Sequence, residues 1–366
     1  GANVIVVDKG KYSTDDLARI RPRVGVALGD VAYTSLIGKD LGGILEHRGK
    51  VRWSDEFQAW VVPTIHPAFA LRRYAERTWL VEDLKLAKRI LDDGGVRPVE
   101  PTQVEIIGSV EHARAMREAI QIAGHVHFDT ETVSNHPRYS LPFIYSFAIR
   151  ERHAYVVARY LHLWTMHWSK TELRELDGII KSILLDEDIT KGGWNIPFDN
   201  NVSCNAYGGF PRNVVWDGMI ASHCVDNHLG WRAHSLKVRA AQLTDLGRYD
   251  DELDAALVAH GFTLDGKPDM GQLWKLPDDA LVQHYAGLDA DASFRLEGIF
   301  TPRLHEAGLW TLYQQERLPI ALEHGVLDRV GVRIDVPYLD RLSVDLAGAL
   351  NDLTGQIDAI AKAARS

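Results

Sequence analysis

The chain has 366 residues, of which 46% are hydrophobic and 25% charged, and its formal net charge is −9. This composition is ordinary for a soluble globular protein, and the length predicts about two domains, at roughly 100–200 residues each. The acidic balance argues against a surface coated in basic residues, but it permits nucleic acid to bind in a local groove or through metal ions. The two cysteines exclude a disulfide framework and a four-thiolate metal site within these residues.

The two ends of the chain and its apolar runs predict where the protein works. No apolar run reaches the roughly 20 residues that a membrane span needs, and the start lacks a signal-peptide pattern. We therefore expect no membrane partner and a cytoplasmic location. Because the chain opens inside an apolar run at 4–7 and closes inside a helical pattern at 361–366, we expect it to be a fragment of a longer protein.

The first segment, residues 1–95, predicts an α/β unit. The apolar run Val24–Leu28 has strand character, and Gly29-Asp30 and a helical pattern at 31–36 follow it. A second apolar run at 60–62 leads into a later helix. The apolar face predicted for that helix contains Trp79, Leu80, Leu84, Leu86, Ala87 and Ile90. Residues 92–98 are polar and contain glycine and proline, so we expect a linker there.

The second segment, residues 96–308, predicts a mixed α/β domain. Its expected elements, in chain order, are a strand at 103–107, a helix at 111–123, strands at 126–130, 144–149 and 154–157, a helix that begins at the capping box of Ser169 and Glu172, and a strand at 189–191. Short polar connections favour an antiparallel arrangement of the three consecutive strands.

The third segment, residues 309–366, is predicted to be mostly helical. Apolar residues recur at a three-four spacing from residue 337 onward and form one continuous seam. The seam consists of Leu339, Leu342, Leu346, Leu350, Leu353, Ile357 and Ile360. We expect this helix to pack in a larger body.

Asp129 and Glu131 form the first candidate metal-binding motif. They follow an apolar strand and are separated by one residue, so both side chains are expected on the same side of the sheet, where they can share a metal ion. Taken alone the spacing is weak evidence, because residues 250–252 repeat it in what we expect to be a solvated loop.

Asp199 ends the second motif, Asn195-Ile196-Pro197-Phe198-Asp199. Pro197 suits the start of a helix, where its missing amide proton is not needed. Asp199 is then expected in the first turn, where the helix dipole favours a carboxylate. Stabilisation of the helix end is the alternative role, and it is the better one for Asp199 in isolation.

Tyr285 and Asp289 form the third motif. They lie four residues apart on one face of a helix that is predicted to begin after Leu276-Pro277. Asp291 is two positions further along, so we expect it to point to solvent. A core tyrosine beside a surface aspartate is a common alternative, but it does not account for the order of the three motifs.

Together the three motifs resemble the DEDD superfamily of 3′–5′ exonucleases, in the tyrosine-bearing subtype of the proofreading domain of bacterial DNA polymerase I. The matching elements are Asp-Thr-Glu-Thr at 129–132, Asn-x-x-Phe-Asp at 195–199 and Tyr-x-x-x-Asp at 285–289. The resemblance extends to 217–222 and 234–237 and covers roughly 102–309. It implies a ribonuclease-H-like fold and hydrolysis of the terminal phosphodiester at the 3′ end of single-stranded DNA, in a bacterial or phage-infected cell.

The resemblance also implies a role for each residue. Asp129, Glu131 and Asp289 are expected to hold one divalent ion beside the attacking water, and Asp129, with Asp199 through water, to hold a second ion near the leaving oxygen. Both ions are Mg²⁺ or Mn²⁺, which suit oxygen ligands. Tyr285 is expected to orient the water. Asn195 is implied to contact the terminal nucleotide, with Thr130 and Phe198 as further substrate contacts.

Loop and strand residues after the first motif are candidates for binding the unpaired strand, because such binding combines backbone electrostatics with aromatic stacking. The candidates are His136, Arg138, Phe143 and Tyr145. For Phe143 and Tyr145 we favour a role in the hydrophobic core over contact with substrate.

Two further resemblances flank this domain. Residues 316–320 and 328–335 resemble the opening of the polymerase domain in family A enzymes, which implies a polymerase domain in cis in the full-length protein. The polymerase motifs are not present, so this fragment is not expected to synthesise DNA. Residues 21–32 and 62–68 resemble the C-terminal half of iron–sulfur-type uracil-DNA glycosylases, which implies that His66 lies near the flipped nucleotide.

The glycosylase resemblance is partial. The glycine-rich loop, the uracil-stacking residues and the cysteines of that family are missing, so we expect a retained DNA-binding or docking module and no base excision. Two alternatives to the exonuclease reading stay open. A ribonuclease D-type RNA exonuclease would use the same four acids, and a scaffold without activity would keep the fold.

Overall fold

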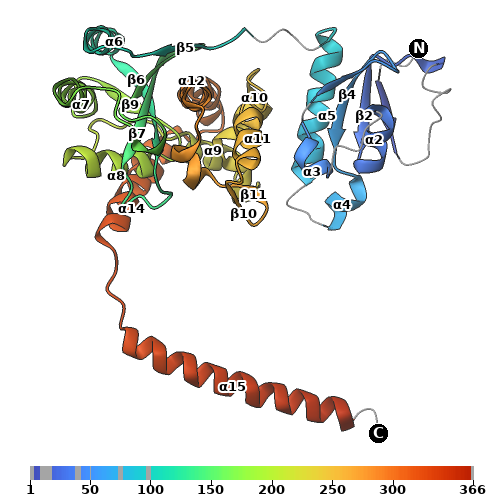
Figure 1. Cartoon of the computed structure of the whole chain (residues 1–366). Helices are drawn as coiled ribbons and strands as arrows, with labels where there is room; N and C mark the ends of the chain where they lie inside the picture. Colours follow the sequence, from blue (N-terminus) through green and yellow to red (C-terminus); the bar gives the residue numbers. More distant parts are fainter. Residues whose placement is uncertain are drawn as a thin grey trace. The chain divides into compact units, whose positions relative to one another are not determined.

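A five-stranded mixed sheet forms the centre of the second segment (Figure 1). The computed structural model describes residues 4–8, 19–37, 43–49, 51–72, 77–95 and 100–363. The strands follow the order β5-β8-β7-β6-β9. Their bounds are β5 (Gln103–Ile106), β6 (His125–Thr132), β7 (Pro142–Arg150), β8 (His153–Ala158) and β9 (Thr190–Gly192).

The antiparallel arrangement expected for β6, β7 and β8 is confirmed. β7 pairs antiparallel with both β6 and β8, while β5 runs parallel to β8 and β9 parallel to β6. The β6–β7 register places Asp129 opposite Ser146 and Glu131 opposite Ile144, and it shifts after Glu131. The first motif therefore lies on a central strand, close to the point where its pairing becomes irregular.

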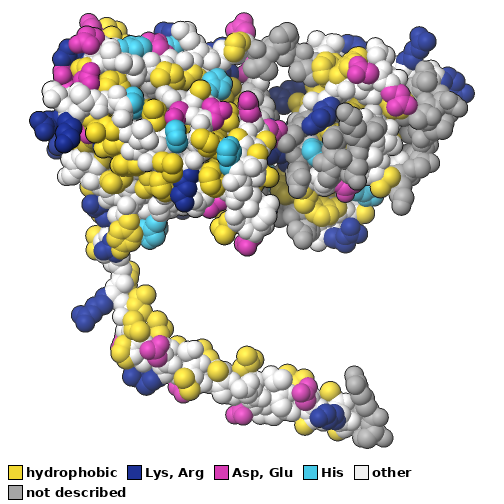
Figure 2. Space-filling view, viewed as in Figure 1, with side chains coloured by type: hydrophobic (Ala, Val, Ile, Leu, Met, Phe, Trp, Pro, Cys, Tyr) yellow, Lys and Arg dark blue, Asp and Glu magenta, His cyan; other side chains and the backbone are white. Residues whose placement is uncertain are grey.

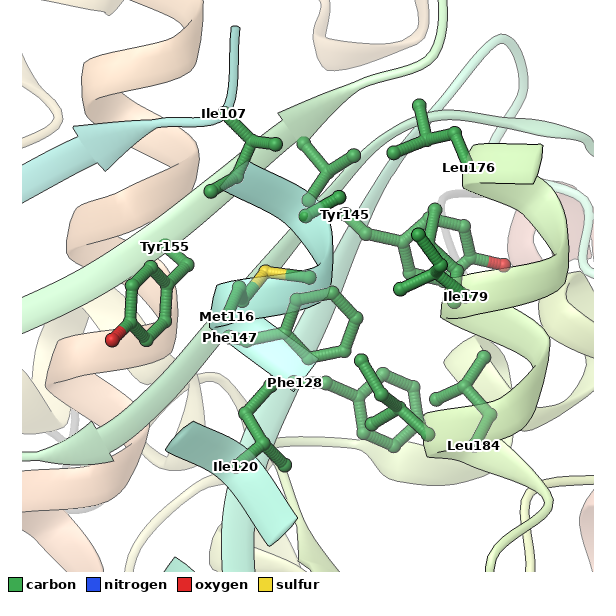
Figure 3. Packing of buried hydrophobic residues seen from close by; sticks show 14 of the residues in the cluster. Ile107, Met116, Ile120, Phe128, Tyr145, Phe147, Tyr155, Leu176, Ile179 and Leu184 are labelled. Carbon is green, nitrogen blue, oxygen red and sulfur yellow. The ribbon is translucent and has the colours of Figure 1, made fainter. Parts of the chain in front are cut away.

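One face of the sheet carries the main hydrophobic core. α6 (Val110–Ala123) and α7 (Lys170–Leu184) cover it, and the expected capping box at Ser169 and Glu172 starts α7. Figure 3 shows Met116 and Ile120 of α6 and Leu176 and Ile179 of α7 around the aromatic rings of the sheet. The labelled rings are those of Phe128, Tyr145, Phe147 and Tyr155.

The opposite face of the sheet packs against α12 (Asp279–Glu306), the long helix predicted to carry the third motif. Side chains alternate along a strand, so Val126 and Phe128 of β6 enter the core on the first face. The intervening residues of β6 therefore face α12. They are His125, His127, Asp129 and Glu131.

Several further elements belong to the second segment or to the start of the third, and α9, α10, α11 and α13 among them contact α12. They are the helices α8 (Ile196–Tyr207), α9 (Gly218–Val225), α10 (Leu236–Leu243), α11 (Asp251–Ala259), α13 (Trp310–Leu312) and α14 (Leu318–Val330), the short 3₁₀ helices η2 (His162–Trp164), η3 (Trp231–His234) and η4 (Met270–Lys275), the π-helical stretch η5 (Tyr313–Arg317), and the hairpin of β10 (Thr263–Leu264) and β11 (Lys267–Pro268). The solvated loop expected at 250–252 is wrong, because Asp251 and Glu252 form the first turn of α11, where the helix dipole favours carboxylates.

The first segment contains its own four-stranded sheet, so the expected α/β unit is confirmed. The strand order is β1-β2-β4-β3, with β3 the one antiparallel strand. The elements are β1 (Val4–Val7), β2 (Val24–Leu28), β3 (Arg52–Ser54), β4 (Ala59–Thr64), α2 (Asp30–Ile37), α3 (Ile44–His47), α4 (Pro67–Arg72) and α5 (Arg77–Asp92). The expected linker begins where α5 ends, and residues 96–99 lie outside the described part.

One residue of α5 departs from the predicted apolar face. Leu84 is 40% exposed, and its neighbour Asp83 is buried instead. The Asp83 carboxylate accepts hydrogen bonds from Arg48 (3.0 Å) and Thr64 (2.7 Å). Burial raises the pKa of Asp83 to about 6, and the Arg48 guanidinium opposes that rise. An ion pair therefore occupies part of the face that periodicity assigned to leucine.

The chain folds as two units, Gly1–Val326 and Leu327–Ser366. The second unit is dominated by α15 (Val336–Ala363), which confirms the predicted helix. Its apolar seam is exposed, with Leu346, Leu350 and Ile357 each 60–65% accessible. Figure 2 shows hydrophobic side chains interspersed with charged ones along this helix. Of the helices in the described residues, none has the length and apolar character that crossing a membrane requires.

Candidate active site

Asp129, Glu131 and Asp289 meet between the sheet and α12. One carboxylate oxygen from each lies within 4.8 Å of the others. β6 supplies the first two from one face because they are two residues apart, and α12 supplies the third across the interface. The expectation that strand alternation would bring Asp129 and Glu131 to one side is therefore confirmed, and the structure adds Asp289 to them.

Asp199 approaches the cluster from the first turn of α8. It is buried, and its carboxylate accepts a hydrogen bond from the Thr130 hydroxyl at 2.5 Å. Asp199 is also the strongest of the charged neighbours that raise the pKa of Asp129. Its predicted position in the first helical turn is confirmed. All four acids of the three motifs therefore lie in one neighbourhood, with Asp199 beside the group of three.

Burial and mutual repulsion make the carboxylates bind protons unusually tightly. Burial, followed by the Asp199, Asp289 and Glu131 carboxylates, raises the pKa of Asp129 well above its usual range. Burial and Asp289 raise the pKa of Glu131 to about 8. Burial also raises the pKa of Asp199 to about 7. A cation among these oxygens would offset the repulsion, as expected for a site that exchanges protons for metal.

The donor set fits divalent ions that prefer oxygen. Three carboxylates converge, which is the ligand type of Mg²⁺ and Mn²⁺, and the group contains no thiolate or imidazole. Glu131 Oε1 is buried and has no hydrogen-bond partner among the residues that the structure describes. A buried, unpaired carboxylate oxygen is costly, and a metal ion is one partner that would satisfy it.

Lys237 and Tyr249 also contact the cluster, and sequence reasoning assigned no role to either. The Lys237 ammonium group, on α10, pairs with Asp289, and it lies 4.4 Å from the centre of the Tyr285 ring. The Tyr249 hydroxyl donates to the same Asp289 oxygen at 2.5 Å. Lys237 stands within residues 234–237, which resemble the family, and this was the one signal in the sequence. Tyr249 had none.

Tyr285 lies one helical turn before Asp289, as predicted. It is buried, and its ring centre is 6.2 Å from that of Tyr249. Burial, followed by the Asp289 and Glu131 carboxylates, raises the pKa of Tyr285 well above its usual range. The hydroxyl group is therefore protonated at neutral pH, so it can donate a hydrogen bond but is not a base.

Asp217 holds the start of the second motif. It is buried, and its carboxylate accepts hydrogen bonds from the backbone amides of Ile196 (2.9 Å) and Ile220 (3.1 Å). The same side chain thus satisfies free amides at the starts of α8 and α9. Directly before Ile196, Asn195 adopts a left-handed conformation (φ 58°), and it is exposed. Asp217 therefore fixes where α8 begins and where Asp199 lies.

The residues expected to contact substrate fall into different environments. Asn195 is exposed and Phe198 half-buried at the start of α8. Thr130 is buried, and its hydroxyl group is used by Asp199. The side chain of His66 belongs to the first segment, where its Nδ1 accepts from the Ala68 amide (3.0 Å) and its Nε2 pairs with Asp8 (3.2 Å). Neither partner of His66 is one of the four acids.

The expectation that Asp291 points to solvent is wrong. Asp291 is wholly buried and pairs with Arg295 one turn later in α12. It also accepts from the Thr102 hydroxyl and from the Arg152 amide (2.7 Å). α12 packs along its length against β5, β7 and β8, so a position turned away from the carboxylate cluster still faces protein. Asp291 ties the helix to the edge of the sheet.

Phe143 and Tyr145 lie in the core, as we placed them first, with exposures of 2% and 0%. The loop before β7 carries the other candidates. His136 and Arg138 are exposed and pack on the ring of Tyr139, which is itself 71% exposed. This loop therefore presents a cation and an aromatic face to solvent.

Comparison with protein families now identifies the second segment. Residues 104–305, more than half of the chain, match the family model described as 3′–5′ exonuclease, of the DNA polymerase A type. The chain belongs to this exonuclease family. The match spans the three carboxylate motifs and all five strands of the central sheet except the first residue of β5. The ribonuclease-H-like α/β fold predicted for this exonuclease domain is confirmed.

Individual relatives are distant. DNA polymerase I of Rhizobium leguminosarum is 27% identical over 186 residues, which are 50% of this chain and 16% of that protein. Two solved structures are each 18% identical. The match to NrnC of Brucella melitensis with bound Mg²⁺ covers 64% of this chain and 96% of the NrnC chain (TM-score 0.42). The match to RNase D of Escherichia coli, an exoribonuclease involved in structured RNA processing, covers 62% of this chain and 50% of the RNase D chain (TM-score 0.40).

Proposed function

We propose that this exonuclease domain shortens single-stranded DNA from the 3′ end by hydrolysing the terminal phosphodiester with two divalent ions, Mg²⁺ or Mn²⁺. The observation that carries the proposal is the convergence of Asp129, Glu131 and Asp289 within 4.8 Å, with Asp199 beside them. The family match and the DNA polymerase I relative support it.

Each residue of the site would have its own role in binding metal or substrate. Asp129, Glu131 and Asp289 would hold one ion, and Asp129 and Asp199 the second. Such ions supply charge stabilisation on the attacking and leaving oxygens of an in-line displacement. Tyr285 donates a hydrogen bond that orients the attacking water. Asn195 and Phe198, at the exposed start of α8, contact the terminal nucleotide, and Thr130 keeps Asp199 in place.

The loop with Arg138 and Tyr139 would bind the unpaired strand leading to the site. An arginine offers charge to a phosphate and an exposed tyrosine offers a ring for a base to stack on. Their exposure, and their position directly after the first motif, support this role.

A ribonuclease D-type enzyme acting on RNA is the second candidate, because it would use the same four acids. We favour DNA because the relative detected by sequence is a DNA polymerase. We further infer that the domain works within a longer polymerase-like protein, with the polymerase domain in cis, in DNA replication or repair. The resemblance of residues 21–32 and 62–68 to half of a uracil-DNA glycosylase supports a role for residues 1–95 in binding DNA without excising uracil.

The deciding experiment offers the chain three substrates that carry a 5′ label. They are a single-stranded DNA, the RNA of the same sequence, and a DNA duplex that contains uracil. We expect a ladder of DNA products shortened from the 3′ end, dependent on Mg²⁺ or Mn²⁺ and absent for Asp129→Ala. Faster loss of RNA would favour the ribonuclease. Formation of abasic sites in the duplex would show that the chain excises uracil, as a glycosylase does. If no product formed from any substrate with either ion, the proposed nuclease activity would be wrong.

A further inference from the structure

A second group of metal-ligand side chains lies on the same face of β6 as the catalytic acids. His125 and His127 come four and two residues before Asp129, and alternation turns all three toward α12. On α12, Glu297 follows Asp289 by eight residues, a rise of about 12 Å along a helix. One ligand atom from each of His125, His127 and Glu297 lies within 4.8 Å of the others.

The two imidazoles converge on a single oxygen. His125 Nε2 lies 2.7 Å, and His127 Nε2 2.6 Å, from Glu297 Oε2. Two imidazole nitrogens and a carboxylate oxygen are a ligand set that zinc takes in proteins, with bonds of about 2.0–2.2 Å. Ligands at that length in a tetrahedron lie about 3.3 Å apart, so a small outward movement of these atoms would admit an ion.

The outer nitrogen of each ring is held by a hydroxyl group. His125 Nδ1 lies 2.8 Å from Thr190 Oγ1, and His127 Nδ1 lies 2.8 Å from Ser293 Oγ. Hydrogen bonds of this kind orient imidazoles that bind metal and select the tautomer. Gly192 leaves room for one of the rings, because an ideal Cβ there would lie 2.5 Å from His127 Nε2.

The Thr190 hydroxyl lies within hydrogen-bond distance of both His125 Nδ1 (2.8 Å) and the Gly124 carbonyl (3.0 Å). When its one proton is donated to the carbonyl, the hydroxyl oxygen accepts from His125 Nδ1–H. In that arrangement the Nε2 lone pair of a neutral His125 is directed toward Glu297, where it can bind an ion.

We propose that His125, His127 and Glu297 form a second metal site, which takes one divalent transition ion of the zinc type and fastens the start of β6 to α12. The side chains of His125 and Glu297 are 28% and 25% exposed, so an ion can enter from solvent and complete its coordination with water. His127 is wholly buried and forms the inner wall.

Glu105 provides an internal comparison. It also bridges two histidines, but His112 binds one of its oxygens (2.5 Å) and His153 the other (2.9 Å). The three side chains therefore share no common point, and they do not form a ligand group of the kind found at Glu297. The chain thus contains a matched control with the same residue types and without convergence.

The test measures zinc uptake by the full chain through competition with a chromophoric chelator, in excess Mg²⁺ to occupy the carboxylate site. We expect one zinc equivalent bound by the unaltered chain and by His112→Gln, and about a tenfold or greater loss of affinity for His125→Gln and Glu297→Gln. Asp289→Asn, which removes a ligand of the other site, should keep the zinc. This outcome does not depend on nuclease activity.

Thermal unfolding separates a metal site from a simple hydrogen-bond network. Zinc should raise the unfolding midpoint of the unaltered chain and of His112→Gln, but not of His125→Gln. Imidazole ¹⁵N resonances should show the Nε2 signals of His125 and His127 shifting on zinc addition. Equal uptake by His125→Gln, or a loss shared by His112→Gln, would overturn the proposal. The proposal would also fail if His125→Gln lowered the unfolding midpoint while zinc left the midpoint of the unaltered chain unchanged. That result would indicate imidazolium–carboxylate pairs without a metal site.

Discussion

The Thr130 hydroxyl donates a hydrogen bond to the Asp199 carboxylate at 2.5 Å, and this bond joins the first motif to the second. The two residues are 69 positions apart, and both are buried. Thr130 lies between Asp129 and Glu131, but alternation turns it to the opposite side of the strand. One tripeptide therefore supplies two carboxylates of the cluster and also positions Asp199 beside them.

Replacing Thr130 with Val should weaken catalysis without unfolding the chain. The shape is kept, but Asp199 loses a charged hydrogen bond that contributes about 1.5–3 kcal/mol. We expect single-turnover cleavage of DNA to slow about tenfold or more, since 1.4 kcal/mol corresponds to a factor of about ten. Thr130→Ser keeps the hydroxyl group and should restore most of the rate. Equal damage from both substitutions would show that the hydroxyl is irrelevant.

Metal binding should strengthen as pH rises. Glu131 has a pKa of about 8 and Asp199 one of about 7, both above their ordinary values. The folded chain therefore holds these protons more tightly than the unfolded chain does. Without metal, its free energy of unfolding falls as pH increases from about 4.5 through 8. Metal displaces the protons, so its effect is larger in the alkaline range.

This pH dependence is measured as the shift in unfolding midpoint on adding Mn²⁺, at pH values below and above the pKa of Glu131. We expect the larger shift above it. Glu131→Gln removes one titrating ligand and should flatten the dependence. The same shift at both pH values in the unaltered chain would contradict the prediction.

Replacing Lys237 with Met should tighten Mn²⁺ binding. The Lys237 ammonium pairs with Asp289, and its charge lowers the pKa of Asp129 and Glu131, so it competes with a metal ion for the same oxygens. Removing a competitor of this kind should change affinity by about 1 kcal/mol. Calorimetric titration measures the change. Lys181→Met, on the exposed side of α7, should leave the affinity unaltered. Weaker binding after Lys237→Met would refute the competition.

Replacing Gly287 with Ala should push α12 away from the sheet. An ideal Cβ at this position would lie 2.7 and 2.8 Å from the two methyl groups of Val104. Overpacking of this kind costs about 1–3 kcal/mol, and the displaced turn contains Asp289, so both stability and cleavage rate should fall. Gly298→Ala, on the exposed side of the same helix, should be neutral or stabilising by up to about 1 kcal/mol. Denaturant unfolding and the cleavage assay measure both effects.

Replacing Asp291 with Asn should destabilise the chain. Arg295 would keep its partner Asp245 (2.6 Å), but it would lose the buried carboxylate of Asp291. Breaking a buried pair by removing one partner costs about 3–5 kcal/mol. Glu175→Gln breaks an exposed pair with Arg114 and should cost about 0–1 kcal/mol. Chemical denaturation followed by circular dichroism compares the two, and equal losses would contradict the assigned burial.

Periodicity and local chemistry were enough to predict the elements that carry the motifs. Alternation placed Asp129 and Glu131 on one side of β6, four-residue spacing placed Tyr285 near Asp289, and Pro197 marked the start of α8. These features depend on residues within one or two turns of each other, so a short stretch of sequence contains all the information they need.

Tertiary structure decided which side chains meet. Lys237 and Tyr249 contact Asp289 from 52 and 40 positions earlier in the chain, and Asp291 is buried because α12 is covered on several sides. Alternation would also place His125 and His127 on the face of the acids, but their partner Glu297 comes from a helix about 170 residues later. A local pattern determines the direction of a side chain relative to its own backbone. What lies opposite depends on how distant segments pack, because that packing sets burial, charge and the identity of each partner.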